Sequence, residues 1–193
     1  HGVRHRIQMA RFPVLKTLEQ FDFTWPKKIN RLQVQDLFRL SFVEKKANVL
    51  FLGGPGLGKT HLALALGHAA CVGGYRVLFS TAVDIVNHLS AAQQGGRLAT
   101  ELARYQRPEV LVMDEVGYLP VDKRGADLLF QVIGNRYERG SIVLTTNKAF
   151  KDWSGIFYND STLASAILDR LLHHSETVPI TGKSKRMQDH TEE

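Results

Sequence analysis

The sequence predicts an α/β domain in which helices flank a largely parallel sheet. Three observations carry this prediction. Short aliphatic runs alternate with helical segments, a glycine-rich turn joins the first such run to a helix, and a later run ends in two acidic residues. Strands separated by helices are typical of parallel sheets. Such sheets bind their ligands at the carboxyl ends of the strands.

Length and composition indicate one globular domain. The chain has 193 residues, of which 44% are hydrophobic and 23% are charged. The one cysteine, Cys71, excludes an internal disulfide and is better explained as a small core residue than as a reactive thiol, which fits a reducing intracellular compartment. No apolar run approaches membrane-spanning length and no signal peptide is evident, so we expect neither a membrane span nor export. Because the chain begins with His1, we expect a fragment.

The positive charge is concentrated ahead of the predicted sheet. Residues 1–47 carry ten Lys and Arg against four Asp and Glu, whereas residues 48–193 carry fifteen of each. A local basic surplus suits nucleic acid or another polyanion, and a solvated basic arm is the other interpretation. We therefore divide the chain into a basic lead-in at 1–47, a core at 48–181 and a tail at 182–193.

The lead-in contains three predicted parts. Residues 1–12 are expected to form an extended basic segment. Residues 13–26 alternate aromatic and polar side chains, which indicates a short strand or an arm packed on the domain; packing is favoured over stacking on bases. Asn30 is a suitable N-cap for a helix that runs to Lys46.

The core is predicted to hold five strands, at 48–52, 76–80, 109–113, 141–145 and 177–180. Helices are expected from the glycine turn to Gly73-Gly74, at 83–94 and 97–106, from Asp122 to Arg139, and at 161–174. Residues 150–160 are expected to form a loop.

The turn from Gly53 to Thr60 has the P-loop spacing G-x-x-x-x-G-K-T between a strand and a helix. Its glycines let backbone N–H groups cradle phosphates, Lys59 can reach the β- and γ-phosphates, and the Thr60 hydroxyl can ligate Mg²⁺. The residues expected to contact ATP are Gly53, Gly54, Pro55, Gly56, Leu57, Gly58, Lys59, Thr60 and His61.

Two later strand ends complete the predicted site. Asp114 can hold the Mg²⁺ shell, and Glu115 beside it can polarise the attacking water, which favours hydrolysis over transfer by a P-loop kinase. Asn147 follows the next strand and can face the γ-phosphate, although an Asn at that place is often only a turn residue.

In these motifs the chain resembles the AAA+ ATPases, and more closely the IstB-like transposition helper ATPases, relatives of DnaC and DnaA. The resemblance extends from about Arg11 to Arg186. It is carried by residues 17–23, 53–60, 112–119, 144–147, 167–171 and 182–184.

The resemblance implies an AAA+-type five-stranded parallel sheet with a reduced or absent lid. It also implies homo-oligomers that share ATP between subunits, with Arg170 as the arginine finger that enters the neighbouring site. A surface pairing of Arg170 with Asp169 or Asp160 is the alternative. Arg186 resembles the sensor-2 arginine, although Lys185 stands where the family has Tyr.

The resemblance also implies two partners: double-stranded DNA, bound largely without sequence preference, and a transposase. It implies a location in the bacterial cytoplasm. The expected DNA contacts are Arg97, Arg104, Arg107, Lys123 and Arg124. His173 and His174 have no further ligand at zinc spacing and are expected to be ordinary polar residues.

The sequence thus predicts an ATP-hydrolysing helper that assembles on target DNA and recruits or stimulates a transposase. A DnaC-like helicase loader is the alternative, and a small-molecule kinase is disfavoured by Glu115.

Overall fold

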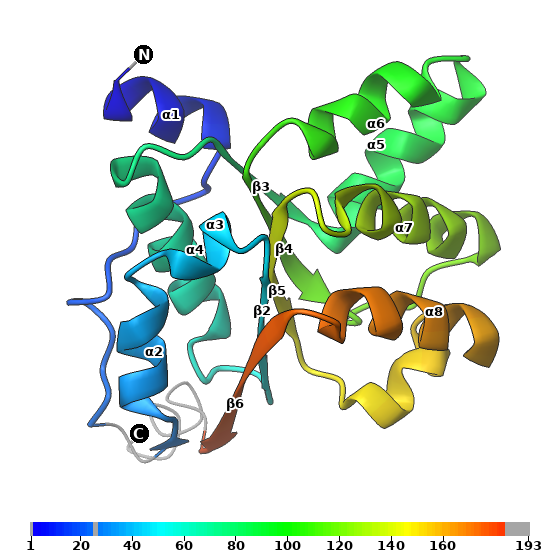
Figure 1. Ribbon diagram of the computed structural model, residues 1–193. Coiled ribbons are helices and arrows are strands. Elements are labelled where there is room, and N and C mark those ends of the chain that lie inside the picture. The colour runs from blue at the N-terminus through cyan, green and yellow to red at the C-terminus, as the bar shows by residue number, and fades with distance from the viewer. Residues whose placement is uncertain (1, 25–26, 184–193) are drawn as a thin grey trace, which may run out of the picture.

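The computed structural model describes residues 2–24 and 27–183. It contains a six-stranded sheet in the order β1-β6-β2-β5-β4-β3 (Figure 1). The strands are β1 (Lys27–Lys28), β2 (Asn48–Gly53), β3 (Val77–Thr81), β4 (Val110–Val116), β5 (Ser141–Thr146) and β6 (Ser175–Gly182). The five predicted strands are all present and parallel. The five-strand prediction was wrong by one, because β1 adds a two-residue antiparallel strand beside β6.

Helices cover both faces of the sheet (Figure 1). One face carries α1 (Val3–Ala10), α2 (Arg31–Leu37), α3 (Ser41–Glu44) and α4 (Lys59–Val72). The other carries α5 (Ala82–Gln94), α6 (Leu98–Gln106), α7 (Lys123–Arg136), the short 3-10 helix η1 (Phe150–Gly155) and α8 (Ser161–Leu172). In the part of the chain that the structure describes, none of these helices has both the length and the apolar character needed to cross a bilayer.

The strands divide the core because successive side chains point to opposite faces. In β4, Val110 and Val112 pack beneath α4, while Leu111 and Met113 pack beneath α5 and α7. All four are fully buried, as expected for parallel strands covered on both sides. Cys71 is also buried in α4, and burial raises the pKa of its thiol to about 11, which makes it a core residue rather than a reactive thiol.

The lead-in differs from its prediction in two places. Residues 1–12 were expected to be extended, but they contain α1, which is docked by Arg6 donating from Nε to the Cys71 carbonyl of α4 at 2.9 Å. The helix expected from Asn30 to Lys46 is two helices, because Leu40 adopts a left-handed conformation with φ 66°. Asn30 does cap the first helix, accepting from the Gln33 N–H.

Other differences are smaller. Residues 150–160 were expected to be a loop but begin with η1, which buries Trp153. The helix capped by Asp122 ends at Arg136 rather than Arg139. Residues 13–24 form no strand; Phe21 is buried in the core cluster that includes α4, which supports the packing interpretation. Most of the predicted tail lies outside the described residues.

Candidate functional site

The P-loop joins the carboxyl end of β2 to the N-terminus of α4. Its backbone requires glycine, since Gly56 and Gly58 have φ of 75° and 94°. A Cβ on Gly58 would also lie 2.6 Å from the ring of Phe21, so the lead-in packs directly against the loop. Two of the four glycines predicted to shape a phosphate cradle, Gly56 and Gly58, therefore have a conformation that favours glycine.

Lys59 and Thr60 begin α4 and lie inside the site. Lys59 is only 3% exposed, and its Nζ donates to the Gly54 carbonyl at 2.6 Å. The Thr60 hydroxyl donates to Asp114, 3.0 Å from Oδ1 and 3.2 Å from Oδ2. The fold thus brings together the two residues that the sequence assigned to Mg²⁺.

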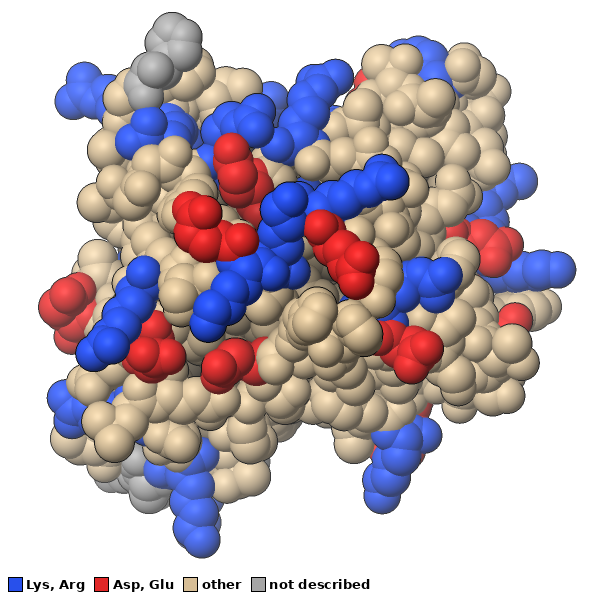
Figure 2. Space-filling model, viewed as in Figure 1, with Lys and Arg blue, Asp and Glu red and all other residues tan. Residues whose placement is uncertain are grey.

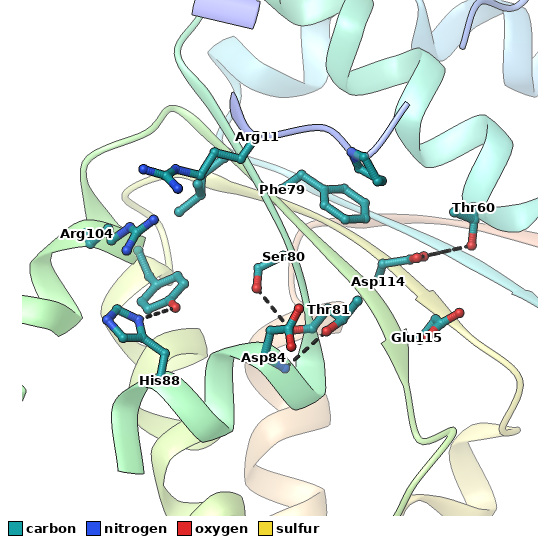
Figure 3. A pocket seen from close by; sticks show the side chains of 13 residues that line it. Arg11, Thr60, Phe79, Ser80, Thr81, Asp84, His88, Arg104, Asp114 and Glu115 are labelled. Atoms are coloured by element: carbon teal, nitrogen blue, oxygen red, sulfur yellow. Dashed lines mark hydrogen bonds between the residues drawn. The ribbon is translucent and has the colours of Figure 1, made fainter. Parts of the chain in front are cut away.

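Asp114 and Glu115 occupy the carboxyl end of β4 and line one pocket of about 470 Å³ together with Thr60. Figure 3 shows these three side chains on one side of the pocket, with Arg11, Arg104 and His88 on the other. Asp114 is buried and Glu115 is exposed. The exposed Glu115 carboxylate can therefore contact a water molecule, as a general base must.

Thr145, near the end of β5, contacts both members of this pair. The Thr145 hydroxyl donates to Asp114 Oδ1 at 2.5 Å and accepts from the Glu115 N–H at 2.8 Å. Asn147 follows the strand, and its Oδ1 is buried without a hydrogen-bond partner among the described residues. A buried acceptor of this kind is usually satisfied by a ligand or water. Sequence spacing indicates Asn147 but not Thr145, because the contacts of Thr145 depend on strand register.

The residues present fit a nucleoside triphosphate with Mg²⁺. A hydroxyl and a carboxylate 3.0 Å apart are the hard oxygen donors that this cation prefers. The positive-φ glycines and the N-terminus of a 14-residue helix supply backbone N–H groups for phosphate. The Asn147 oxygen, which has no hydrogen-bond partner in the part of the chain that the structure describes, follows β5, the strand beside β2.

His61, predicted to contact the nucleotide, faces the lead-in. Its Nε2 lies 2.8 Å from the Thr17 carbonyl, and its ring packs edge-on against Phe21. Burial lowers the pKa of His61 below 6.5; the hydrogen bond to Thr17 opposes this shift, and the charge of Lys16 adds to it. The imidazole is therefore a neutral donor to the lead-in, and any nucleotide contact would come from its backbone.

Arg170 lies on α8 and packs against α7. Its guanidinium lies 4.8 Å from the centroid of the Phe130 ring and donates to the Ala166 carbonyl. Among the described residues it forms no salt bridge with Asp169 or Asp160. The structure therefore does not contain the surface ion pair that was the alternative explanation for Arg170. Arg186, the sensor-2 candidate, lies outside the described residues.

The candidate DNA contacts fall into separate groups. Arg104 and Arg107 line a groove of about 580 Å³ between α1 and α6. Side chains of α1 and Arg11 also line this groove. Lys123 and Arg124 lie together at another hollow, at the start of α7, and Arg97 is exposed just before α6. Figure 2 shows cationic side chains along the upper edge of this face, near α1 and α6, with both signs mixed below.

The fold places a third possible metal ligand, Glu138, beside His173 and His174, although it is distant from them in the sequence. Glu138 lies 3.8 Å from His173 Nε2, and the three ligand atoms lie within 4.8 Å of one another. All three side chains are exposed, and such groupings are common on surfaces without an ion. They remain best described as polar surface residues.

Comparison with known proteins gives a family model and relatives that agree with one another. A family model described as "IstB-like ATP binding protein" matches residues 1–193. The chain is 48% identical over 188 residues to an insertion sequence IS21 protein of Pseudomonas aeruginosa, and 46% identical over 188 residues to an IS5376 protein of Geobacillus stearothermophilus. Both are named, provisionally, as ATP-binding proteins. The matches cover 97% of this chain and 71% and 74% of the relatives.

Solved structures share the fold. DnaI matches with a TM-score of 0.74 over 91% of this chain and 94% of its own, at 18% identity, which shows the fold alone. A replication initiator DnaA, solved with AMPPCP and single-stranded DNA bound, matches with a TM-score of 0.69 at 25% identity. That match covers 91% of this chain and 53% of the DnaA chain. The sheet and its flanking helices thus resemble those of the AAA+ P-loop domains in these structures.

Proposed function

This chain belongs to the family of IstB-like ATP-binding proteins, and we propose that it hydrolyses ATP while it assembles on DNA as a helper of transposition. The observation that carries the proposal is the common pocket of Thr60, Asp114 and Glu115. Hydrolysis needs a residue that positions or deprotonates the attacking water, a task that ATP binding alone does not require. The insertion-sequence relatives support the link to transposition and to the bacterial cytoplasm.

In this proposal each residue has one task. The P-loop N–H groups and Lys59 hold the phosphates, and Thr60 with Asp114 would hold Mg²⁺, which supplies charge neutralisation at the phosphates. Glu115 accepts a proton from the attacking water, and Asn147 orients that water or the γ-phosphate. The exposure of Glu115 and the unpartnered Asn147 oxygen support these assignments.

The proposed DNA contact is supported by charge and by position in the fold. The groove that contains Arg104 and Arg107 lies beside α1, in the region with the basic surplus, and suits the sugar-phosphate backbone of duplex DNA. The similar DnaA structure was solved with single-stranded DNA bound. Arg170 would complete the ATP site of a neighbouring copy, and the assembled oligomer would recruit the transposase.

The direct test measures ATP turnover with and without duplex DNA while particle size is followed in parallel. We expect DNA to raise turnover and ATP to enlarge the particle. An ATP turnover rate that is the same with and without duplex DNA, together with capture of a replicative helicase, would favour the helicase-loader alternative. Phosphate that appears on a metabolite instead of in solution would establish a kinase.

Two substitutions test the roles of Lys59 in ATP binding and of Glu115 in hydrolysis. Lys59→Ala should abolish ATP binding, because the buried ammonium is the main fixed charge of the loop. Glu115→Gln should bind ATP but lower kcat by about 10²- to 10⁴-fold, the usual contribution of a general base. A fluorescent ATP analogue measures binding, and phosphate release measures kcat. Asp152→Asn, at an exposed carboxylate of η1, is the control. Normal hydrolysis by Glu115→Gln would remove Glu115 from its role.

A further inference from the structure

The end of β4 contains a β-bulge opposite Thr145. Met113 pairs with Leu144, and Val116 pairs with Thr146, so three steps along β4 match two steps along β5. One extra residue is therefore accommodated in β4, at Asp114 and Glu115. Bulges of this kind disrupt the ladder locally and change the direction of side chains, often beside active sites.

The bulge explains how two consecutive acidic residues reach the same pocket. In a regular strand, neighbouring side chains point to opposite faces of the sheet, so Asp114 and Glu115 would be separated. Here Glu115 adopts a left-handed conformation with φ 62°, and both residues line the pocket with Thr60 (Figure 3). Such a conformation in a residue other than glycine persists only where surrounding contacts hold it.

Thr145 supplies those contacts through one hydroxyl group. Its side chain is fully buried, and the hydroxyl both donates to Asp114 Oδ1 at 2.5 Å and accepts from the Glu115 N–H at 2.8 Å. It thus supplies an acceptor for the Glu115 N–H at the point where the strand register shifts. It also fixes the rotation of the Asp114 carboxylate, whose Oδ1 is shared with Thr60.

We propose that Thr145 is a positioning residue that holds Asp114 and Glu115 in their working directions across the bulge. The inference rests on the proposed ATPase function and extends it to a fully buried residue. Loss of the hydroxyl would free the Asp114 carboxylate to rotate away from Thr60 and would remove the Thr145 acceptor of the Glu115 N–H. Mg²⁺ use and turnover should then weaken together, while the P-loop keeps its hold on the nucleotide.

Thr145→Val is the decisive variant, because valine has the shape of threonine without a hydrogen-bonding group. We expect nucleotide binding in the absence of Mg²⁺ to stay within about threefold of wild type. The Mg²⁺ concentration for half-maximal tightening of binding should rise about 10- to 100-fold, and kcat should fall by a similar factor with little change in the KM for ATP. Thr145→Ser keeps the hydroxyl and should restore both quantities to within about threefold.

Ser141→Ala is the matched structural control. Ser141 is a fully buried hydroxyl of the same strand, but it donates to the Phe42 carbonyl at the far end of β5. Both variants should lower the unfolding temperature, and only Thr145→Val should change the Mg²⁺ dependence. If Thr145→Val does not fold, Thr145→Cys, with a weakly hydrogen-bonding thiol of similar size, takes its place.

The possible outcomes distinguish failure of the proposed ATPase function from failure of the proposed role of Thr145. A wild-type protein that binds ATP but never releases phosphate would overturn the proposed function, and the Mg²⁺ dependence of nucleotide binding would still test Thr145. A hydrolysing wild type with an unchanged Thr145→Val variant would overturn the positioning role alone. Equal losses in Thr145→Val and Thr145→Ser would also overturn it, because the hydroxyl would then be irrelevant.

Discussion

At the scale of single residues, the site depends on a few polar side chains that are buried with defined partners. Lys59 is directed back over the loop by the Gly54 carbonyl, and Thr60 is directed toward Asp114. Because buried polar groups are costly without partners, these contacts restrict each side chain to one orientation.

His61 gives a prediction at this scale. Burial lowers its pKa below 6.5, so between that lowered pKa and 6.5 the folded chain binds fewer protons than the unfolded chain. The free energy of unfolding should therefore fall as the pH decreases through this window. In His61→Gln, which can still donate to the Thr17 carbonyl, the fall should be smaller. Urea unfolding of both proteins between about pH 7.5 and about pH 5.5 measures the difference. Identical pH profiles would show that His61 titrates normally.

At the scale of elements, the two ends of the sheet have different tasks. The carboxyl ends of β2, β4 and β5 carry the site, while the opposite end is tied together by Arg136 of α7. This side chain is 2% exposed and donates from NH1 and NH2 to five backbone carbonyls, those of Tyr105, Gln106, Pro108, Glu109 and Ser141. Burial lowers the pKa of Arg136 to about 10 although Glu109 opposes this, so it stays charged at neutral pH.

Arg136→Met should therefore destabilise the fold strongly. It would leave several buried carbonyls without a donor, at about 1–3 kcal/mol for each one that water cannot reach. We expect a loss of about 3 kcal/mol or more in urea unfolding, with ATP binding retained under native conditions. Arg139→Met, three residues later and exposed, should change stability by less than about 0.5 kcal/mol. Similar values for the two variants would contradict the assigned role of Arg136.

At the scale of the whole molecule, the lead-in is part of the same core as the P-loop helix. Ala10, Phe21, Val34 and Phe42 are buried in the cluster that includes α4. The basic groove between α1 and α6 and the pocket of Asp114 and Glu115 both include Arg11 and Arg104 in their linings. The proposed DNA contact and the proposed ATP site are therefore neighbours on one rigid framework.

The proposed oligomer gives the prediction at this scale. Arg170→Ala should keep ATP binding and lower the DNA-stimulated ATPase rate at least about 100-fold, as expected for loss of an arginine finger. Mixing it with Glu115→Gln should restore part of the turnover, because some interfaces would then combine an intact Glu115 with an intact Arg170. Phosphate release from the mixture and from each variant alone is the measurement.

A packing effect must be separated from a role in the neighbouring site. Arg170 also packs on Phe130, so Phe130→Leu is the control: it removes the ring and keeps the guanidinium. If Phe130→Leu reproduces the loss, or if the mixture stays inactive, Arg170 acts within its own subunit.

The sequence by itself determined the fold class and the five parallel strands, and its motifs predicted the candidate site residues Gly53–Thr60, Asp114 and Glu115. These features are local: they depend on spacing within one segment and on the alternation of side chains along a strand. Tertiary structure alone decided that residues 3–10 are helical, that Leu40 breaks a helix and that Thr145 bridges Asp114 and Glu115. The physical reason is that these features depend on register and packing between segments distant in the chain, where contacts across the fold outweigh local preference.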